Sequence, residues 1–425
     1  MKQVYKKTVL DNGLALISHT MPGMQSVALG IWIRVGGRYE NAHYKGISHF
    51  LEHLLFKGSK RFSCRALKEA IEGVGGSLNG FTSEELTCYL TKLPRQHFSL
   101  ALDILSDMVL HPLLAPVDIE KERTVILEEI KMYKDLPQSY VHELLDNLLW
   151  PDQPLGMSIA GSFESVARIH KEEISSFKSE YYVPANMVVS AVGALSHETL
   201  VRKATRIFAH DFTGKIPAFM RANEDGRLPQ LEILGKDTEQ THLALGFHSL
   251  KRDHPKRHAL ALLHIILGAN MSSRLFNEVR EIRGLAYEIG TQVRRFHDTG
   301  AFVVHAGMDN NKVSDAIAVI LKELEKIKNA LVSESEFHRS KEFYLGQLRL
   351  ALEDTLDHML WIGEATSCLD RSLTLQEIVR AVNRLRREDI REVARLIFDE
   401  SKLRLALIGP VENRKEDIAQ QLHIA

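Results

Sequence analysis

The sequence is poor in cysteine and carries almost no net charge, and each of these absences excludes a class of protein. Its three cysteines, Cys64, Cys88 and Cys368, form no CxxC pair. This excludes a disulfide framework and a thiolate zinc site, and it is typical of a reducing compartment. With 54 Lys and Arg against 55 Asp and Glu, the formal charge is −1. The basic excess of a nucleic-acid-binding protein or of a polybasic membrane anchor is therefore missing.

Long apolar runs are also missing. No run approaches the about 20 residues that a transmembrane helix needs, and the N-terminal region has no apolar signal-peptide core. We therefore expect a cytoplasmic protein without a nucleic-acid or membrane partner. What the chain does contain is 44% hydrophobic and 26% charged residues over 425 positions, which is ordinary globular composition. This length predicts two or three domains.

Two apolar segments that end in glycine recur in the two halves of the chain. Residues 27–30 (VALG) resemble residues 243–246 (LALG), and residues 187–193 resemble residues 403–409. Matches of this length arise easily by chance when taken singly. Both pairs share one offset of 216 positions, however, and a shared offset indicates an internal duplication.

The hydrophobic periodicity of the two halves agrees with a duplication. Each half has a helical segment after its first strand, then a strand-rich region, an amphipathic helix and a charged helix. These segments are residues 46–56, 77–93, 98–110 and 171–181 in the first half, and residues 258–267, 287–306, 313–327 and 387–398 in the second. We predict an α+β fold of two tandem duplicated domains, each a largely antiparallel sheet with helices packed on one face. The predicted domains are residues 1–212 and 230–425, joined by a linker at 213–229 that contains two Pro and two Gly.

The first predicted helix contains His49-Phe-Leu-Glu52-His53. At 3.6 residues per turn, His49 and His53 lie about 40° apart on one helix face. Two imidazoles placed in this way can bind one Zn²⁺, with Glu52 beside the metal as a general base. The alternative is that these are ordinary polar residues on a solvated face. Because the chain has 20 histidines, an accidental match has a probability of roughly a few per cent, and the motif alone is insufficient.

A third ligand is needed, because a catalytic zinc normally has three protein ligands and an open position for water. The helical segment 119–133 offers four acids, which are Glu120, Glu122, Glu128 and Glu129. A run of acids is more often a solvated helix face. Yet Glu122 and Glu129 are seven residues apart and share a face, so one can bind the metal while the other supports it. The residues alone leave this choice open.

Taken together, the motifs resemble those of the M16 metallopeptidases, or inverzincins, a family that includes pitrilysin, insulin-degrading enzyme and the mitochondrial processing peptidase. The segments that carry the resemblance are residues 36–40 (GGRYE), 46–58 (GISHFLEHLLFKG), 75–82 (GGSLNGFT), 122–129 (ERTVILEE) and 273–287 (SRLFNEVREIRGLAY). The resemblance covers essentially the whole chain. Length and motif order are most similar to the bacterial processing-peptidase-like members and to the β subunit of the mitochondrial enzyme.

The resemblance implies an activity and a metal. It implies that His49, His53 and Glu129 bind one zinc ion per chain. Glu52 would be the general base, and Glu122 would be the supporting acid. The implied activity is that of a zinc-dependent endopeptidase that hydrolyses unstructured peptides or presequence-like segments.

The resemblance also implies substrate-binding residues. Asn79 and Gly80 would lie on an edge strand that holds the substrate, although most relatives have alanine where this chain has Gly80. Arg280 and Tyr287 in the second half would bind the substrate backbone. Without the family context, Arg280 reads as a surface charge and Tyr287 as a core aromatic.

Two alternatives share this fold. One is a non-catalytic subunit like the core proteins of the respiratory bc1 complex, and the other is an active subunit that needs an inactive partner. The chain keeps both the metal motif and the pair Arg280 and Tyr287, which favours an active enzyme. Its length gives half the domains of the single-chain relatives that enclose a chamber, so we expect a homodimer.

Overall fold

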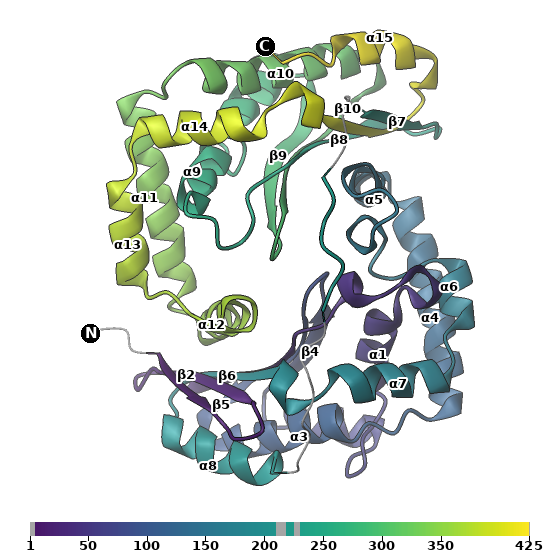
Figure 1. Cartoon of the computed structure of the whole chain (residues 1–425), viewed down its shortest axis with the longest axis vertical. Helices are drawn as coiled ribbons and strands as arrows, with labels where there is room; N and C mark the ends of the chain where they lie inside the picture. The colour runs from purple at the N-terminus through teal and green to yellow at the C-terminus, as the bar shows by residue number, and fades with distance from the viewer. Residues whose placement is uncertain (1–4, 210–217, 225–229, 425) are drawn as a thin grey trace. The chain divides into compact units, whose positions relative to one another are not determined.

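The computed structural model describes residues 5–209, 218–224 and 230–424. By their contacts these residues divide into two compact units of helices around a sheet (Figure 1). Unit 1 comprises Met1–Ile130, Ser158–Met220 and Leu348–Glu377, and unit 2 comprises Lys131–Met157, Arg221–Gln347 and Ile378–Ala425. The predicted linker at 213–229 lies outside the described residues except for positions 218–224.

Unit 1 is built on a six-stranded sheet in the order β1-β2-β6-β3-β5-β4. Its strands are β1 (Lys6–Val9), β2 (Ala15–Thr20), β3 (Ser26–Ile33), β4 (Ser77–Thr82), β5 (Thr87–Pro94) and β6 (Met187–Gly193). Only the β2–β6 pair is parallel. β6 is buried at every position, as expected for a Val-rich strand covered on both faces. β4 lies at the edge and alternates between exposed and half-buried residues.

One face of this sheet packs against the helices of the N-terminal half. The helices on this face are α1 (Ile47–Leu55), α2 (Cys64–Glu72), α3 (Phe98–Leu110), α4 (Pro116–Asp135), α6 (Phe163–Arg168), α7 (Lys171–Tyr181) and α8 (His197–Ile207). Their apolar residues recur at helical spacing and form one continuous core with the inward residues of β2, β3 and β6. α4 is the helix in which the chain leaves unit 1.

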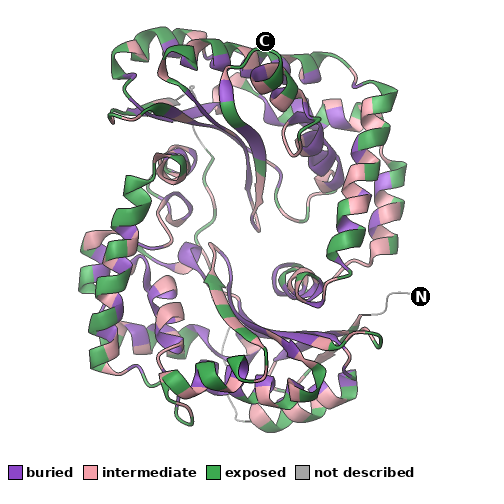
Figure 2. Cartoon of the chain, turned by 180° about the vertical axis from the view of Figure 1, so that it is seen from behind, coloured by how far each residue is buried: buried purple, intermediate pink, exposed green. Residues whose placement is uncertain are grey.

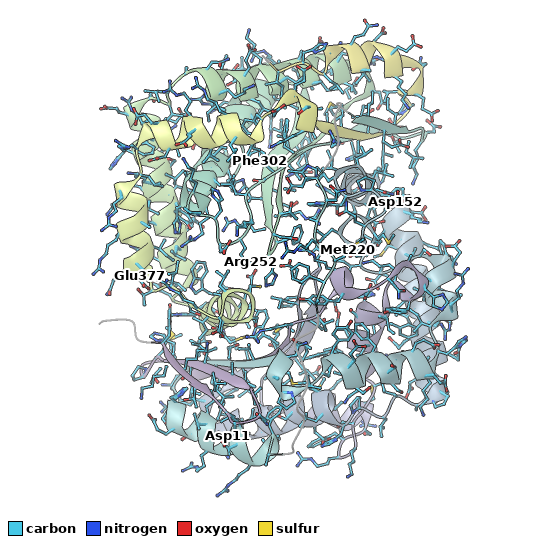
Figure 3. The ribbon with its side chains drawn as sticks, in the orientation of Figure 1. Asp11, Asp152, Met220, Arg252, Phe302 and Glu377 are labelled. Carbon is cyan, nitrogen blue, oxygen red and sulfur yellow. The ribbon has the colours of Figure 1, made fainter. Side chains whose placement is uncertain are left out.

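Unit 2 has a five-stranded sheet in the order β7-β11-β8-β10-β9. Its strands are β7 (Gln230–Leu234), β8 (Gln240–His248), β9 (Ala286–Arg295), β10 (Gly300–Asp309) and β11 (Arg404–Ile408). Its helical segments are α9 (Arg257–Leu267), a π-helix (Phe276–Glu281), α10 (Val313–Asn329), α14 (Arg387–Ile397) and α15 (Lys415–Gln421), together with most of α11 (Glu334–Ala351) and of α13 (Leu375–Arg384). Phe302, labelled in Figure 3, is fully buried in the core between this sheet and its helices.

The two sheets have the same topology, which confirms the predicted duplicated α+β fold. β2-β6-β3-β5-β4 corresponds to β7-β11-β8-β10-β9, and in each sheet only the first of these pairs is parallel. The repeated segments are β3 with β8 and β6 with β11. Gly30 on β3 lies opposite Ser190 on β6, so the offset of 216 would place Gly246 on β8 opposite residue 406. Gly246 lies opposite Arg404 instead, so the register of this strand pair is shifted by two residues. An even shift leaves every side chain on the same face.

The second face of each sheet is covered by a helix from the other half of the chain, which differs from the one-face packing that we predict. In unit 1, α12 (Thr355–Leu369) places Met359 and Ile362 against Trp32 and its neighbours. In unit 2, α5 (Pro137–Leu149) packs on β8 and β11. The central strands of both sheets are therefore buried on both faces, while the edge strands β1, β4 and β9 keep exposed residues (Figure 2). Each half of the chain thus gives one helix to the sheet of the other half, α12 to unit 1 and α5 to unit 2. For this reason the two units do not correspond to a division of the chain at the predicted linker.

The glycines at the ends of the repeated segments have a packing role at these helices. A Cβ on Gly30 would lie 2.7 Å from Sδ of Met359 in α12, and a Cβ on Gly246 would lie 2.9 Å from a methyl of Leu145 in α5. Both distances are shorter than van der Waals contact. The glycines therefore let the exchanged helices approach the strands.

Candidate metal centre

Helix α1 buries one face and leaves the predicted metal-binding residues half-buried on the other. Ile47, Leu51 and Leu54 are buried in the core of unit 1. The periodicity of 3.6 residues then places His49, Glu52 and His53 together on the opposite face. The hydrophobic anchors thus fix which way the polar face points.

The first turn of α1 is held by a carboxylate that sequence reasoning left without a role. Glu40 accepts hydrogen bonds from the backbone N–H of Gly46 at 2.9 Å and of Ser48 at 2.7 Å. Its side chain is buried beside Lys45, whose Nζ lies 3.4 Å away. Amides in the first turn of a helix have no intrahelical partner, and a carboxylate there also complements the helix dipole. The only sequence signal is an acid a few residues before the helix.

Helix α4 brings a third potential ligand to the two histidines. Oε2 of Glu129 lies 3.7 Å from Nε2 of His49 and 3.7 Å from Nε2 of His53. One ligand atom from each of these residues lies within 4.8 Å of the others, and no other such trio occurs among the residues described. Glu128, the neighbouring acid, is exposed. The structure thus brings together His49, His53 and Glu129.

The donor set fits zinc in chemistry and in spacing. Ligand atoms about 2.1 Å from a tetrahedral ion lie about 3.4 Å from one another, close to the spacing seen here. Burial and, to a smaller extent, the neighbouring His53 together lower the pKa of His49 to about 4. His49 is therefore a neutral imidazole at neutral pH, with a lone pair available to a metal. Two imidazoles and one carboxylate are a donor set that catalytic zinc takes.

His53 is oriented through its other ring nitrogen. Its Nδ1 lies 3.1 Å from Oε2 of Glu122, and Oε1 of Glu122 lies 2.5 Å from Nζ of Lys57. A hydrogen bond from Nδ1 fixes the tautomer that leaves Nε2 free for a metal. This is the position that we predict for Glu122. Lys57 is an addition from the structure, although it lies within the GISHFLEHLLFKG segment.

The predicted base, Glu52, has a partner that the sequence did not indicate. Oγ1 of Thr82, at the end of β4, donates a hydrogen bond to Oε2 of Glu52 at 3.1 Å. Burial raises the pKa of Glu52 and Glu129 adds to this effect, while His53 and Thr82 oppose it. A carboxyl group with a raised pKa takes up a proton more readily than an exposed one, as a general base must.

The predicted substrate-binding strand is β4, at the edge of the sheet of unit 1. Asn79 is exposed, and its Oδ1 accepts a hydrogen bond from the N–H of Gly80 at 2.8 Å. A Cβ on Gly80 would lie 3.0 Å from the ring of Phe56. Glycine therefore relieves crowding at this position, where we otherwise expect alanine.

The other predicted substrate-binding residues lie together in unit 2. Arg280 belongs to the π-helix, and its guanidinium carbon is 5.4 Å from the ring centroid of Tyr287 on β9. The side chain of Tyr287 is 75% exposed, so the alternative interpretation of Tyr287 as a core aromatic is wrong. A role for this pair in substrate binding stays a prediction.

Family models match both halves of the chain. Residues 15–162 match the model described as Insulinase (Peptidase family M16), and residues 168–344 match the Peptidase M16 inactive domain. The chain is 35% identical to the Uncharacterized zinc protease YmxG of Bacillus subtilis, over 96% of this chain and 99% of that protein. It is 34% identical to a Streptomyces coelicolor protein that is also named an uncharacterized zinc protease, over 99% and 92% of the two chains.

Solved structures share the fold. A protease from Helicobacter pylori superposes with a TM-score of 0.90 at 22% identity, covering 96% of this chain and all of that one. A chain of complex III from Candida albicans superposes with a TM-score of 0.84 at 18% identity, covering 98% and 99%. None of the described helices is both long and apolar enough to cross a bilayer. By its sequence relatives and by its fold, the chain belongs to peptidase family M16 and is similar to proteins named zinc proteases.

Proposed function

We propose that this protein is a zinc-dependent endopeptidase that hydrolyses unstructured peptides or presequence-like segments. The observation that carries the proposal is the trio of His49, His53 and Glu129, whose ligand atoms lie within 4.8 Å of one another. Glu52 is on the same helix face as the two histidines. This combination supplies three ligands and a base, which is what metal-assisted hydrolysis of an amide uses.

The roles follow from the side chains. A zinc ion held by His49, His53 and Glu129 would act as a Lewis acid that makes water more acidic and polarises a peptide carbonyl. Glu52 accepts a proton from the attacking water and then donates it to the leaving amine, so the base is regenerated. Glu122 accepts a hydrogen bond from His53 and holds its ring in place. No side chain forms a covalent bond to the substrate.

The substrate class follows from the edge strand β4. An edge strand has free backbone donors and acceptors, which pair with an extended segment through main-chain hydrogen bonds. Such pairing is largely indifferent to the substrate's side chains but requires the segment to be unfolded. We therefore propose that the enzyme cuts unstructured peptides and leaves stably folded proteins intact.

The test assays one peptide sequence twice, free in solution and locked inside a stable folded host. Rapid cleavage of the free peptide, negligible cleavage of the host, loss of activity with a chelator and recovery with added zinc are expected. Equal rates for the two forms would contradict the substrate class. Activity that survives complete zinc removal would contradict the zinc mechanism.

The competing function is that of a non-catalytic subunit, because a complex III chain shares this fold. The complete set of ligands and base in this chain favours catalysis. Purified protein that binds zinc yet cuts none of a diverse library of unfolded peptides would favour the subunit role.

We also propose that the active form is a homodimer, because the chain has half the domains of the single-chain relatives that enclose a chamber. Light scattering during turnover tests this. A fully active monomer would contradict it, and activity that requires a second, different chain would favour the heterodimer alternative.

A further inference from the structure

The hydroxyl group of Thr82 joins the proposed base to the proposed substrate strand. Thr82 is the last residue of the edge strand β4, and its Oγ1 donates to Oε2 of Glu52 at 3.1 Å. Within the described part of the chain, this is the one hydrogen bond that the carboxylate of Glu52 receives. A donor on Oε2 restrains rotation of the carboxylate and leaves Oε1 available to accept a proton.

The backbone segment 36–40 holds Thr82 and Glu52 close to each other. The N–H of Gly37 donates to the carbonyl of Ser83 at 3.0 Å, and the N–H of Arg38 donates to the carbonyl of Glu84 at 2.7 Å. These bonds hold the turn that directly follows Thr82. A Cβ on Gly36 would lie only 2.0 Å from the carbonyl oxygen of Ser83, so glycine is required for this approach.

The same segment also anchors the turn and the metal-binding helix by side chains. Arg38 forms a buried ion pair with Glu85 at 2.8 Å, within the turn after Thr82. Glu40 caps the first turn of α1, which carries Glu52. One short segment therefore ties the end of β4 to the start of α1, and Thr82 and Glu52 face each other as a result.

From this geometry we infer that Thr82 is a positioning residue for hydrolysis, whose hydroxyl orients the carboxylate of Glu52 beside the strand that receives the substrate. The inference rests on the proposed role of Glu52 as the base. While Glu52 is ionised, Thr82 donates to it. When Oε1 takes a proton from water, the bond from Thr82 to Oε2 is kept, so no proton is gained or lost at Thr82.

The competing explanation is that Thr82 is only a β-branched residue that stabilises the end of a strand. Thr82→Val separates the two explanations, because valine keeps the shape and the strand propensity and removes only the donor. Thr82→Ser keeps the donor and removes the methyl group. A structural role predicts that serine is the more harmful change, whereas positioning predicts that valine is.

The experiment measures kcat and KM on an unfolded peptide for wild type, Thr82→Val and Thr82→Ser, with zinc content determined for each protein. Peptide affinity is measured by fluorescence anisotropy in Glu52→Gln and in Glu52→Gln combined with Thr82→Val. We expect Thr82→Val to lower kcat by about tenfold or more. General base catalysis typically raises the rate by about 10²–10⁴-fold, and a misoriented base loses part of this increase. Thr82→Ser should restore most of this loss. KM, zinc content and peptide affinity should stay unchanged.

The outcomes separate this inference from the proposed function. Wild-type kcat in Thr82→Val, or a Thr82→Ser variant as slow as Thr82→Val, would overturn the positioning role while leaving Glu52 as the base. A fall in zinc content or peptide affinity that matches the loss of kcat would also overturn it in favour of a structural role. Wild-type kcat in Glu52→Gln would instead overturn the proposed base and the inference with it.

Discussion

Unit 1 and unit 2 share one sheet topology but differ in the helix that follows the first repeated strand. Helix α1 of unit 1 leaves His49, Glu52 and His53 half-buried on one face, whereas nine of the eleven residues of α9 in unit 2 are buried. At the shared offset of 216 positions, unit 2 has Ile265, Gly268 and Ala269. The sheet is therefore a scaffold common to both units, and the units differ in the polar groups that one helix face presents.

The two edge strands also differ. β4 of unit 1 ends in Thr82, which contacts the proposed base, while β9 of unit 2 carries the exposed ring of Tyr287 beside Arg280. In the proposed mechanism, unit 1 carries out hydrolysis and unit 2 contributes part of the substrate binding. The first three of the following changes each test one side of this division, and the last tests the helix packing in both units.

The largest expected effect is on catalysis in unit 1. Glu52→Gln should lower kcat by about 10²–10⁴-fold, because glutamine cannot take up the proton of water. Zinc content should remain about one ion per chain, since Glu52 is not a ligand in this account. Glu128→Gln, which changes an exposed acid on α4, is the matched control and should behave as wild type. Retained activity in Glu52→Gln would refute the assigned base.

The next effect is on metal binding in unit 1. Glu129→Gln should weaken zinc binding by about a hundredfold or more, because a neutral amide is a poorer ligand than a carboxylate and even supporting residues are worth about 10–100-fold. Competition with a chromogenic chelator measures this. Glu128→Gln again serves as the control. Zinc loss in Glu128→Gln but not in Glu129→Gln would show that the neighbouring acid is the ligand.

A smaller effect is expected from unit 2. Arg280→Ala and Tyr287→Phe should each lower kcat/KM by about tenfold with zinc content unchanged, because these side chains would contact substrate and not metal. Steady-state kinetics on an unfolded peptide provide the measurement. Wild-type kinetics in both variants would leave unit 2 without a role in substrate binding.

The smallest effect concerns the helices that the two halves exchange. Gly30→Ala and Gly246→Ala should each destabilise the protein by about 1–3 kcal/mol, because the added methyl would overlap Met359 or Leu145. Gly346→Ala is the control: it lies inside α11, its Cβ would meet nothing within 4 Å, and it should stabilise by about 0.5–1 kcal/mol. Denaturant unfolding measures all three. Unchanged stability in both of the first two variants would show that these glycines are not needed for close packing.

Local periodicity was enough to predict much of this fold. The expected helices at 98–110 and 171–181 match α3 and α7 residue for residue, and the HxxEH spacing predicted the shared face of His49 and His53. The three-residue metal group could be anticipated because its members belong to two strongly helical segments with a known motif. Its geometry in the structure agrees with that expectation, while the functional roles stay predictions.

Features that depend on contacts between distant parts of the chain could not be predicted from the sequence. Nothing in the apolar spacing of α5 or α12 says that each helix packs on the sheet formed mainly by the other half. The bonds of Glu40 to the start of α1, of Lys57 to Glu122 and of Thr82 to Glu52 likewise join residues whose separation in space no periodicity encodes. The sequence shows that glycine at positions 30 and 246 belongs to a repeat. It does not show that each glycine makes room for a helix from a distant part of the chain.

The proposed metal centre is tested most directly by a crystal structure of the zinc-loaded protein, with anomalous scattering recorded on both sides of the zinc absorption edge. We expect one strong zinc peak per chain, bonded to Nε2 of His49, Nε2 of His53 and the carboxylate of Glu129, with Glu52 beside it and not bonded to the ion. A peak in unit 2, or a zinc ion that lacks these three ligands, would show that the polar face of α1 in unit 1 is not the metal centre.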